Sequence, residues 1–279
     1  MILYYAVGGG MGHLARASAV LNTLQIPKEA VKVLTASPFA SLYFQDLPVL
    51  PLPAHLNNDP EFYEIWLKQQ CKKYEFTEIW VDSFPCGILG ELGCLLDLPL
   101  KWTYLARILH WENYCGLIKF TPPFQRVIQL EMLETSHQDF LKSLECPIEH
   151  ISLEYPVYQD NTKKIFSQND WLVVHSEPQT EVEELLAYAQ DQANLENIKP
   201  RFCLISPIKK IDLDIDFEHF NLYPSHPYFN QAGRIFTACG FNSMTQTLPF
   251  REKHHFLPFL RRFDNQFLRA TLHKKDKYF

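Results

Sequence analysis

The chain has 279 residues, of which 47% are hydrophobic and 21% are charged. These proportions are close to the globular average and exclude disordered, collagen-like and coiled-coil proteins. With 26 basic and 32 acidic residues the net charge is −6, which argues against a general affinity for nucleic acid.

The chain shows no signs of a membrane-spanning or secreted protein. Its most apolar segment, 84–100, is broken by Glu91 and Asp97, so we expect no transmembrane helix. The start methionine leads directly into an apolar run without a basic region, which favours a first strand over a signal peptide. The seven scattered cysteines form no CxxC pair. Reduced thiols and a cytoplasmic location are therefore predicted.

The first half of the chain alternates between strand-like and helix-like segments. Short apolar runs predict strands at 2–7, 31–36, 77–84 and 101–106. Apolar residues at helical spacing predict helices at 13–24, 60–74, 86–97 and 124–144. Repeated strand–helix units of this kind imply a doubly wound parallel sheet with right-handed crossovers.

The alternation stops and then resumes in the second half. Apolar periodicity is weak over 157–169, which we predict to be a linker between domains 1–156 and 170–279. Beyond it we expect strands at 171–176, 201–206, 234–239 and 254–259, and helices at 180–194, 242–248 and 265–275. The expected architecture is therefore two α/β domains facing each other across a cleft.

A glycine cluster joins the first strand to the first helix. Only 10 glycines occur in the chain, and four of them are at positions 8, 9, 10 and 12. Gly10, Gly12 and Ala15 fit the GxGxxG/A pattern of dinucleotide-binding proteins, but that site also needs an acidic residue about 20 residues later. The second strand ends Thr35-Ala36-Ser37 without a carboxylate, so we do not favour a nicotinamide dehydrogenase.

His13 lies at the start of the first predicted helix and has two interpretations. The positive end of the helix dipole disfavours an imidazolium, so a neutral ring could accept a proton as a general base. Alternatively, the ring caps the helix or packs on Met11.

Several segments together resemble one family of enzymes. GGGMGHLARA (8–17), IWVDSFPCGILGEL (79–92) and TYLARIL (103–109) are similar to the first half of GT-B nucleotide-sugar glycosyltransferases. AGRIFTACGFNSMTQTLPF (232–250) and FLPFLRRFDNQFLRA (256–270) resemble the donor-site region of that fold. The likeness is greatest to the peptidoglycan N-acetylglucosaminyltransferase (MurG-like) group. It implies two Rossmann-like domains, the C-terminal one shortened because the chain ends soon after the Asp-x-Gln motif.

The resemblance implies a role for the turn before the helix at 242–248. Unpaired backbone N–H groups there would stabilise the donor diphosphate and the charge that grows on the departing nucleotide, without a metal or other cofactor. The residues of this turn are Gly240, Phe241, Asn242 and Ser243.

The remaining roles are also carried over from the resemblance. Gln246 stands where the family usually has a glutamate that holds the ribose hydroxyls, and Asp264 and Gln266 would contact hydroxyls of the donor sugar. His13 would take a proton from the acceptor hydroxyl, so that a single displacement inverts the anomeric centre. Gly10 and Gly12 would form a phosphate or acceptor loop.

Simpler structural roles remain open for several of these residues. Asn242, Ser243 and Asp264 could be helix N-caps, and Gln246 could be a solvated helix position. Asp82 ends a strand on the side where open α/β sheets bind ligands, or it caps the next helix. Arg107 and Glu91 are further candidates for the acceptor cleft.

Metal binding and membrane contact have weaker support. Asp212, Asp214 and Asp216 form DxD steps, but their alternation with apolar residues favours an edge strand or a solvated loop, and we predict no metal site. Residues 115–128 mix apolar and basic side chains, which is compatible with peripheral membrane contact or with a core helix entry.

The sequence therefore predicts an inverting, metal-independent glycosyltransferase with a nucleotide-sugar donor, most naturally a UDP-sugar. Its acceptor is a glycan, a lipid-linked sugar or a small molecule. A non-catalytic nucleotide-sugar or partner-binding protein and a nucleotide-sugar epimerase are the alternatives.

Overall fold

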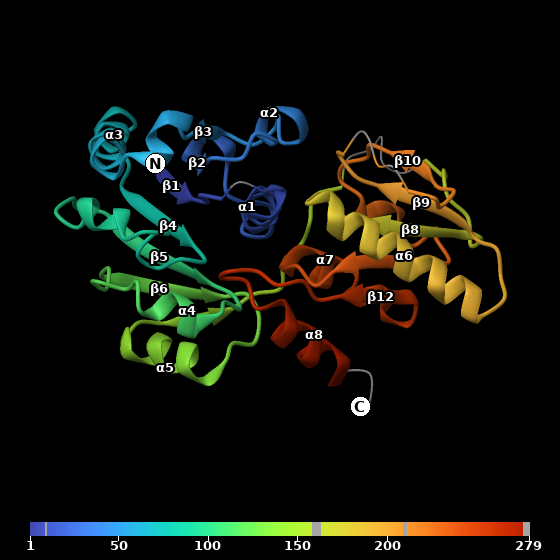
Figure 1. Ribbon diagram of the computed structural model, residues 1–279. Helices are drawn as coiled ribbons and strands as arrows, with labels where there is room; N and C mark the ends of the chain where they lie inside the picture. Colours follow the sequence, from blue (N-terminus) through green and yellow to red (C-terminus); the bar gives the residue numbers. More distant parts are fainter. Residues whose placement is uncertain (9, 158–162, 209–210, 212, 276–279) are drawn as a thin grey trace. The chain divides into compact units, whose positions relative to one another are not determined.

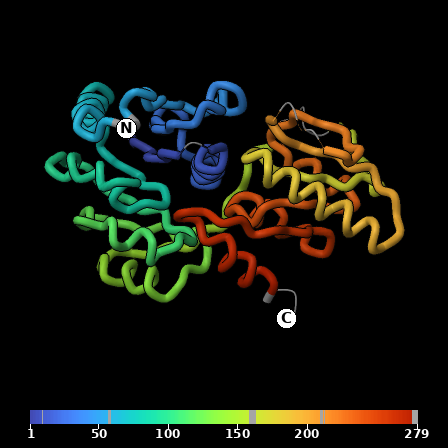
Figure 2. The backbone as a smooth tube through the Cα atoms, in the orientation of Figure 1, coloured from blue at the N-terminus to red at the C-terminus, as the bar shows by residue number. Residues whose placement is uncertain are grey.

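The chain forms two compact units in the computed structural model (Figures 1 and 2). The structure describes residues 1–8, 10–157, 163–208, 211 and 213–275. The first unit holds residues 1–155 and 262–264, and the second holds 156–261 and 265–279. Residues 158–162 of the predicted linker lie outside the described residues. Phe166, which also belongs to the predicted linker 157–169, is buried in the second unit's core.

The first unit is built on a parallel sheet with the strand order β3-β2-β1-β4-β5-β6-β7. The strands are β1 (Ile2–Tyr5), β2 (Val31–Thr35), β3 (Val49–Pro51), β4 (Glu78–Asp82), β5 (Lys101–Ala106), β6 (Phe124–Gln129) and β7 (Ile148–His150). All four residues of β1 are buried, as expected for a strand inside a parallel sheet that is covered on both faces.

The helices of the first unit connect these strands. They are α1 (Met11–Thr23), α2 (Ala40–Tyr43), α3 (Pro60–Lys73), α4 (Trp111–Cys115) and α5 (Thr135–Ser143), with 3-10 turns η1 (Lys28–Ala30), η2 (Ala54–Asn58) and η3 (Glu91–Leu95). In α1, Leu14, Ala17 and Leu21 are buried at helical spacing, which fixes the helix against the unit's core.

The second unit repeats this design around a smaller parallel sheet with the order β10-β9-β8-β11-β12. Its strands are β8 (Asp170–Val174), β9 (Arg201–Ile205), β10 (Glu218–Phe220), β11 (Arg234–Ala238) and β12 (His254–Leu257). Its helices are α6 (Gln179–Leu195), α7 (Phe241–Gln246) and α8 (Gln266–Lys275), with 3-10 turns η5 (His226–Tyr228) and η6 (Leu248–Lys253).

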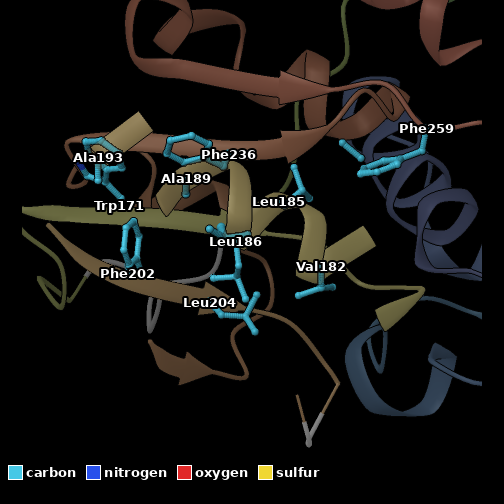
Figure 3. Packing of buried hydrophobic residues seen from close by; sticks show 12 residues of the cluster. Trp171, Val182, Leu185, Leu186, Ala189, Ala193, Phe202, Leu204, Phe236 and Phe259 are labelled. Atoms are coloured by element: carbon cyan, nitrogen blue, oxygen red, sulfur yellow. The ribbon is translucent and has the colours of Figure 1, made fainter. Parts of the chain in front are cut away.

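Helix α6 runs along one face of this second sheet (Figure 1). Val182, Leu185, Leu186 and Ala189 recur at helical spacing and are buried. Figure 3 shows these side chains packed against aromatic and aliphatic residues of the strands, namely Trp171, Phe202, Leu204 and Phe236. This apolar face holds α6 on the sheet.

Two predicted helices are wrong. In 86–97 only η3 forms, because Gly87 and Gly90 adopt the left-handed backbone conformation (φ 84° and 91°) and interrupt the helical turn. In 124–144, strand β6 occupies the first six residues, between β5 and β7, and α5 follows it. The short apolar run of β6 is compatible with the spacing of a helix or of a strand. Hydrogen bonding to β5 on one side and to β7 on the other favours the strand.

The same finding changes the interpretation of the segment 115–128. Phe124, Val127 and Ile128 are buried in β6, so this part of the segment is a core strand and not the entry to a core helix. In the described part of the chain, no helix has the length and apolar character needed to cross a membrane. All seven cysteines, each at a described position, are free thiols.

Candidate active site

Both sheets reverse their strand order at one place. In the first unit the order reverses between β1 and β4, and in the second between β8 and β11. Open α/β sheets bind ligands at the carboxyl ends of the strands beside such a reversal. His13, in the first turn of α1, and Asp82, at the end of β4, meet at this position in the first unit.

His13 and Asp82 form a hydrogen-bonded pair. The His13 Nδ1 atom lies 2.8 Å from Asp82 Oδ2. A carboxylate only accepts hydrogen bonds, so we assign the proton to Nδ1, which leaves Nε2 as the nitrogen able to accept a proton. This is the arrangement of a general base held in one tautomer by an acid. The structure thus gives the His13 ring a partner outside its own helix, and it gives the Asp82 carboxylate two side-chain partners on α1, His13 and Arg16.

Arg16 binds the same carboxylate from the next turn of α1. Its Nε atom donates to Asp82 Oδ1 at 2.7 Å and its Nη2 atom to Oδ2 at 2.5 Å, which is a two-pronged pair. The Arg16 and Asp82 side chains are 3% and 0% exposed, whereas 18% of His13 is exposed. The histidine is thus the member of this cluster that solvent or a substrate can reach.

The electrostatics of the cluster favour a neutral imidazole. Burial lowers the pKa of His13 below its ordinary value; the hydrogen bond that the ring donates to Asp82 acts against this, and the positive charge of Arg16 lowers the pKa further. Burial acts to raise the pKa of Asp82, but Arg16 and His13 hold that pKa well below its usual range. Near neutral pH the pair is therefore a carboxylate beside an uncharged ring.

Gly8 allows the backbone to approach the His13 ring closely. A Cβ atom at position 8 would lie 2.4 Å from His13 Cδ2 and 2.7 Å from Nε2. Real Cβ contacts are never this short, so a side chain here would displace the ring or block its Nε2 edge. Gly10 is the N-cap of α1 without a side-chain hydrogen bond, and Gly12 lies exposed in its first turn.

Ser83 connects this cluster to Arg107. Its hydroxyl accepts from Arg16 Nη2 at 3.0 Å and from Arg107 Nε at 2.7 Å. Ser83 has a positive φ of 73°, a conformation that is strained for a serine. Arg107 in turn donates from Nη1 to Asp264 Oδ1 at 2.5 Å.

Asp264 reaches this network because residues 262–264 belong to the first unit. The backbone N–H of His110 donates to the carbonyl of Phe263 at 2.7 Å, and the Phe263 ring packs on Phe84 and Tyr114. The helix N-cap proposed for Asp264 is instead Asn265, whose side chain accepts from the Leu268 N–H.

Gln266, the other half of the Asp-x-Gln motif, has different partners from Asp264. Gln266 belongs to the second unit, where it is buried and accepts a hydrogen bond from the Phe259 backbone at 3.0 Å. Glu91 also lies apart from the His13 cluster. Its carboxylate accepts from the Tyr5 hydroxyl and from the backbone N–H groups of Ile88 and Leu89, so it stabilises the turn before η3.

In the second unit, the predicted donor turn follows β11. Gly240 is the N-cap of α7 and has no side chain with which to cap it, and a Cβ on Gly240 would meet nothing within 4 Å. Asn242 and Ser243 are half-buried residues inside α7, so they are not its N-cap. Phe241 is buried, and Gln246 is half-buried at the end of α7.

The same edge of the second sheet carries a partly buried ion-pair cluster. Glu181 accepts from both terminal nitrogens of Arg261, and His175 Nε2 lies 2.9 Å from its carboxylate. The sequence offered little to reveal this cluster, because Arg261 is 80 residues from Glu181 in the chain.

Arg16 and Ser83 were missed by the sequence interpretation. The signal for Arg16 was available, because His13 and Arg16 lie three residues apart on one helix face. Ser83 had no comparable signal, since its role depends on two arginines from separate elements.

Among the described residues, no three histidines, cysteines or carboxylates are grouped closely enough to hold a metal ion. Asp212 lies outside the described residues, whereas Asp214 and Asp216 are exposed in a loop before β10.

Comparison with known proteins gives a result at the level of the fold. The chain matches no family model and no curated protein by sequence. Among solved structures it is similar to the spinosyn forosaminyltransferase SpnP, with a TM-score of 0.64, 11% identity, and 98% of this chain and 83% of that chain covered. The chain has the GT-B fold.

Two further GT-B neighbours differ in activity. Phytolacca americana UGT2, complexed with UDP-2fluoro-glucose and pterostilbene, has a TM-score of 0.57 and 13% identity over 98% of this chain and 83% of that chain. UDP-N-acetylglucosamine 2-epimerase from Rickettsia bellii has a TM-score of 0.56 and 10% identity over 95% and 80%. Identities this low establish the fold alone, so the GT-B class is confirmed and the activity rests on the site.

Proposed function

We propose that this GT-B chain is an inverting glycosyltransferase that moves a sugar from a nucleotide-sugar to an acceptor hydroxyl. One observation carries the proposal: a partly exposed histidine, held in one tautomer by a buried carboxylate, at the strand-order reversal of the first sheet. Buried ionisable groups with shifted pKa values are concentrated at functional sites, so a His–Asp–Arg cluster at a ligand-binding edge favours a catalytic role.

In the proposed reaction His13 is the catalytic base. Nε2 takes the proton from the acceptor hydroxyl, and the oxygen forms a bond to the anomeric carbon as the bond from that carbon to the diphosphate breaks. The electron pair leaves with the nucleoside diphosphate, and the anomeric configuration inverts. Asp82 stabilises the imidazolium that forms.

For the donor we propose the turn Gly240–Ser243. Strand β11 leads directly into this turn, and Gly240 at the N-cap of α7 has no side chain to block the approach of a diphosphate to the backbone dipoles there. Charge on the leaving group would then be stabilised without a metal. A UDP-sugar is the donor we favour, since UGT2 holds a UDP-sugar and the Rickettsia enzyme is named for one. The contacts of Gln246, Asp264 and Gln266 with sugar or ribose hydroxyls stay predictions, as does the MurG-like subgroup.

An epimerase is the second candidate, because one neighbour with this fold is a nucleotide-sugar epimerase. The two functions differ in one requirement: a transferase consumes an acceptor, whereas an epimerase changes the donor sugar by itself. A protein that binds the nucleotide but turns nothing over would be the non-catalytic alternative.

The first experiment measures nucleotide binding and turnover. UDP, TDP and GDP are titrated by calorimetry, and UDP-sugars are incubated with and without an acceptor-rich extract, in the presence of EDTA. We expect nucleotide release that depends on the acceptor and persists in EDTA. His13→Gln should reduce it by a factor on the order of 10² or more, while His150→Gln, an exposed histidine at the end of β7, should leave it unchanged.

The outcomes separate the candidates. No binding of any nucleotide up to millimolar concentration would contradict every version of the proposal. Epimerised donor without acceptor would favour the epimerase. Full transfer by the His13→Gln variant would show that another group is the base.

A further inference from the structure

Arg16 occupies an unusual place beside a proposed catalytic base. It lies one turn after His13 on the same face of α1, and its guanidinium binds both oxygens of Asp82, the residue that orients His13. The Asp82 carboxylate is therefore shared between a histidine and an arginine, with both the arginine and the carboxylate almost wholly buried.

This sharing decides which charge state of His13 is stable. A buried carboxylate with only a histidine beside it favours an imidazolium, because the two opposite charges then compensate each other. Here Arg16 already compensates Asp82, and protonation of His13 would add a positive charge to a balanced cluster.

The other charged groups around His13 preserve this balance. Arg107, after β5, is paired with Asp264 of the segment 262–264. Two guanidinium groups thus face two carboxylates. Tyr4 of β1, Tyr104 of β5 and Tyr155 also interact with Asp82, Arg16 or Arg107, and their hydroxyls are uncharged at neutral pH. His137, which faces Arg107, is a neutral imidazole because burial lowers its pKa to about 3.

We propose that Arg16 is a positioning residue that takes up the charge of Asp82 and so keeps the His13 imidazole neutral and oriented for proton removal. Its meaning for catalysis rests on the proposed function, whereas the charge state of His13 can be measured without any substrate. Burial is the largest cause of the lowered His13 pKa, and the charge of Arg16 lowers that pKa further, which agrees with this role.

Ser83 holds the arginine in place. Its hydroxyl accepts from both Arg16 and Arg107, and its strained backbone, with φ of 73°, brings that hydroxyl between the two guanidinium groups. The guanidinium group of Arg16 is therefore hydrogen-bonded to both Asp82 and Ser83. These bonds keep it from rotating away from the Asp82 carboxylate.

The test is an NMR pH titration of the His13 ring, identified among the eleven histidines by comparison with His13→Gln. In the wild type we expect a midpoint below 6.5, the ordinary value for histidine. Arg16→Gln should raise this midpoint by about one unit or more, because Asp82 then acts on His13 alone. Arg16→Lys keeps the charge and should stay within about half a unit of the wild type. In a transfer assay, the acid limb of the pH profile should move in parallel.

A double variant and a control make the test decisive. Arg16→Gln with Asp82→Asn removes both buried charges, so the His13 midpoint should return to the wild-type value even if the single variant does not fold. Arg234→Gln removes a similar two-pronged arginine–carboxylate pair, with Glu196 in the second unit, and should not shift the midpoint.

An unchanged midpoint in folded Arg16→Gln, or a raised midpoint in the double variant, would overturn the proposal. Failure of the proposed function would show differently: the titrations would behave as expected while no nucleotide-sugar was turned over.

Discussion

At the scale of single residues, the active-site hypothesis depends on one edge of the His13 ring. Nδ1 is committed to Asp82, so any proton must be taken by Nε2. The backbone at Gly8 lies directly beside that nitrogen. A glycine is needed here because of the close approach and not because of its backbone angles.

This contact gives a prediction for Gly8→Ala. The new methyl group would lie within 2.7 Å of two ring atoms, so His13 must move and its bond to Asp82 must lengthen. Transfer should fall on the order of 10²-fold, the cost typical of a misplacement of about 1 Å in an active site. Steady-state kinetics of the purified variant would measure this loss.

A matched control is Gly116→Ala in the same unit. Gly116 has an ordinary backbone conformation (φ −65°) at the end of α4, and a Cβ there would meet nothing within 4 Å. Its activity should equal that of the wild type. Equal activity of the Gly8→Ala variant would mean that the ring has room to move without consequence.

At the scale of elements, packing of α6 supports the sheet that carries the proposed donor turn. Leu185 is fully buried between α6 and the strands, whereas Leu195, the last residue of the same helix, is 80% exposed. Substitution of either leucine changes helix propensity in the same way, but only Leu185 removes apolar surface from water. A comparison of the two substitutions therefore isolates the contribution of core packing.

We expect Leu185→Ala to lower the free energy of unfolding by about 2–5 kcal/mol, the range for a large residue truncated in a core. Leu195→Ala should change it by less than about 0.5 kcal/mol. Urea unfolding followed by circular dichroism would give both values. Similar effects of the two substitutions would show that the face drawn in Figure 3 is not what holds α6.

At the scale of the whole molecule, the two units share the chain in an interleaved way. The chain passes from the first unit to the second at 155/156, returns for residues 262–264, and leaves again for α8. The returning segment is anchored in the first unit by Phe263 and by the Arg107–Asp264 pair. Stability of the first unit thus depends on residues near the end of the chain.

Stability should also depend on pH, through buried neutral histidines. His137 is fully buried against Trp111, with ring centroids 3.9 Å apart, and burial, assisted by Arg107, lowers its pKa to about 3. An unfolded chain binds a proton at this residue below about pH 6.5, whereas the folded chain does not until about pH 3. Acidification therefore favours the unfolded state.

From pH 7 to pH 5 this linkage should remove about 2 kcal/mol of stability for His137. The measurement is the free energy of unfolding in urea at both pH values. His137→Gln, which cannot titrate, should show a drop that is smaller by this amount, although the variant starts from a lower stability. An equal drop in both proteins would mean that His137 is protonated in the folded state.

The sequence alone determined the class of the fold. Two parallel α/β sheets follow from apolar runs separated by amphipathic helices; these runs are β1, β2, β4, β5 and four strands of the second unit. A strand buried on both faces is a continuous apolar run, and such a run can be recognised from a few neighbouring residues. The same local information brought attention to His13, Asp82 and the turn at Gly240. It failed in 86–97 and in β6, where left-handed glycines and pairing on both edges outweighed helical spacing.

Only the tertiary structure decided how the chemical groups combine. The tautomer of His13 depends on Asp82, the charge of Asp82 depends on Arg16, and Asp264 reaches Arg107 across 157 residues of chain. Hydrogen bonds and ion pairs act over a few ångströms regardless of sequence distance, so no local pattern encodes them. Folding also gave Asp264 and Gln266, two residues of one short motif, hydrogen-bond partners in different units.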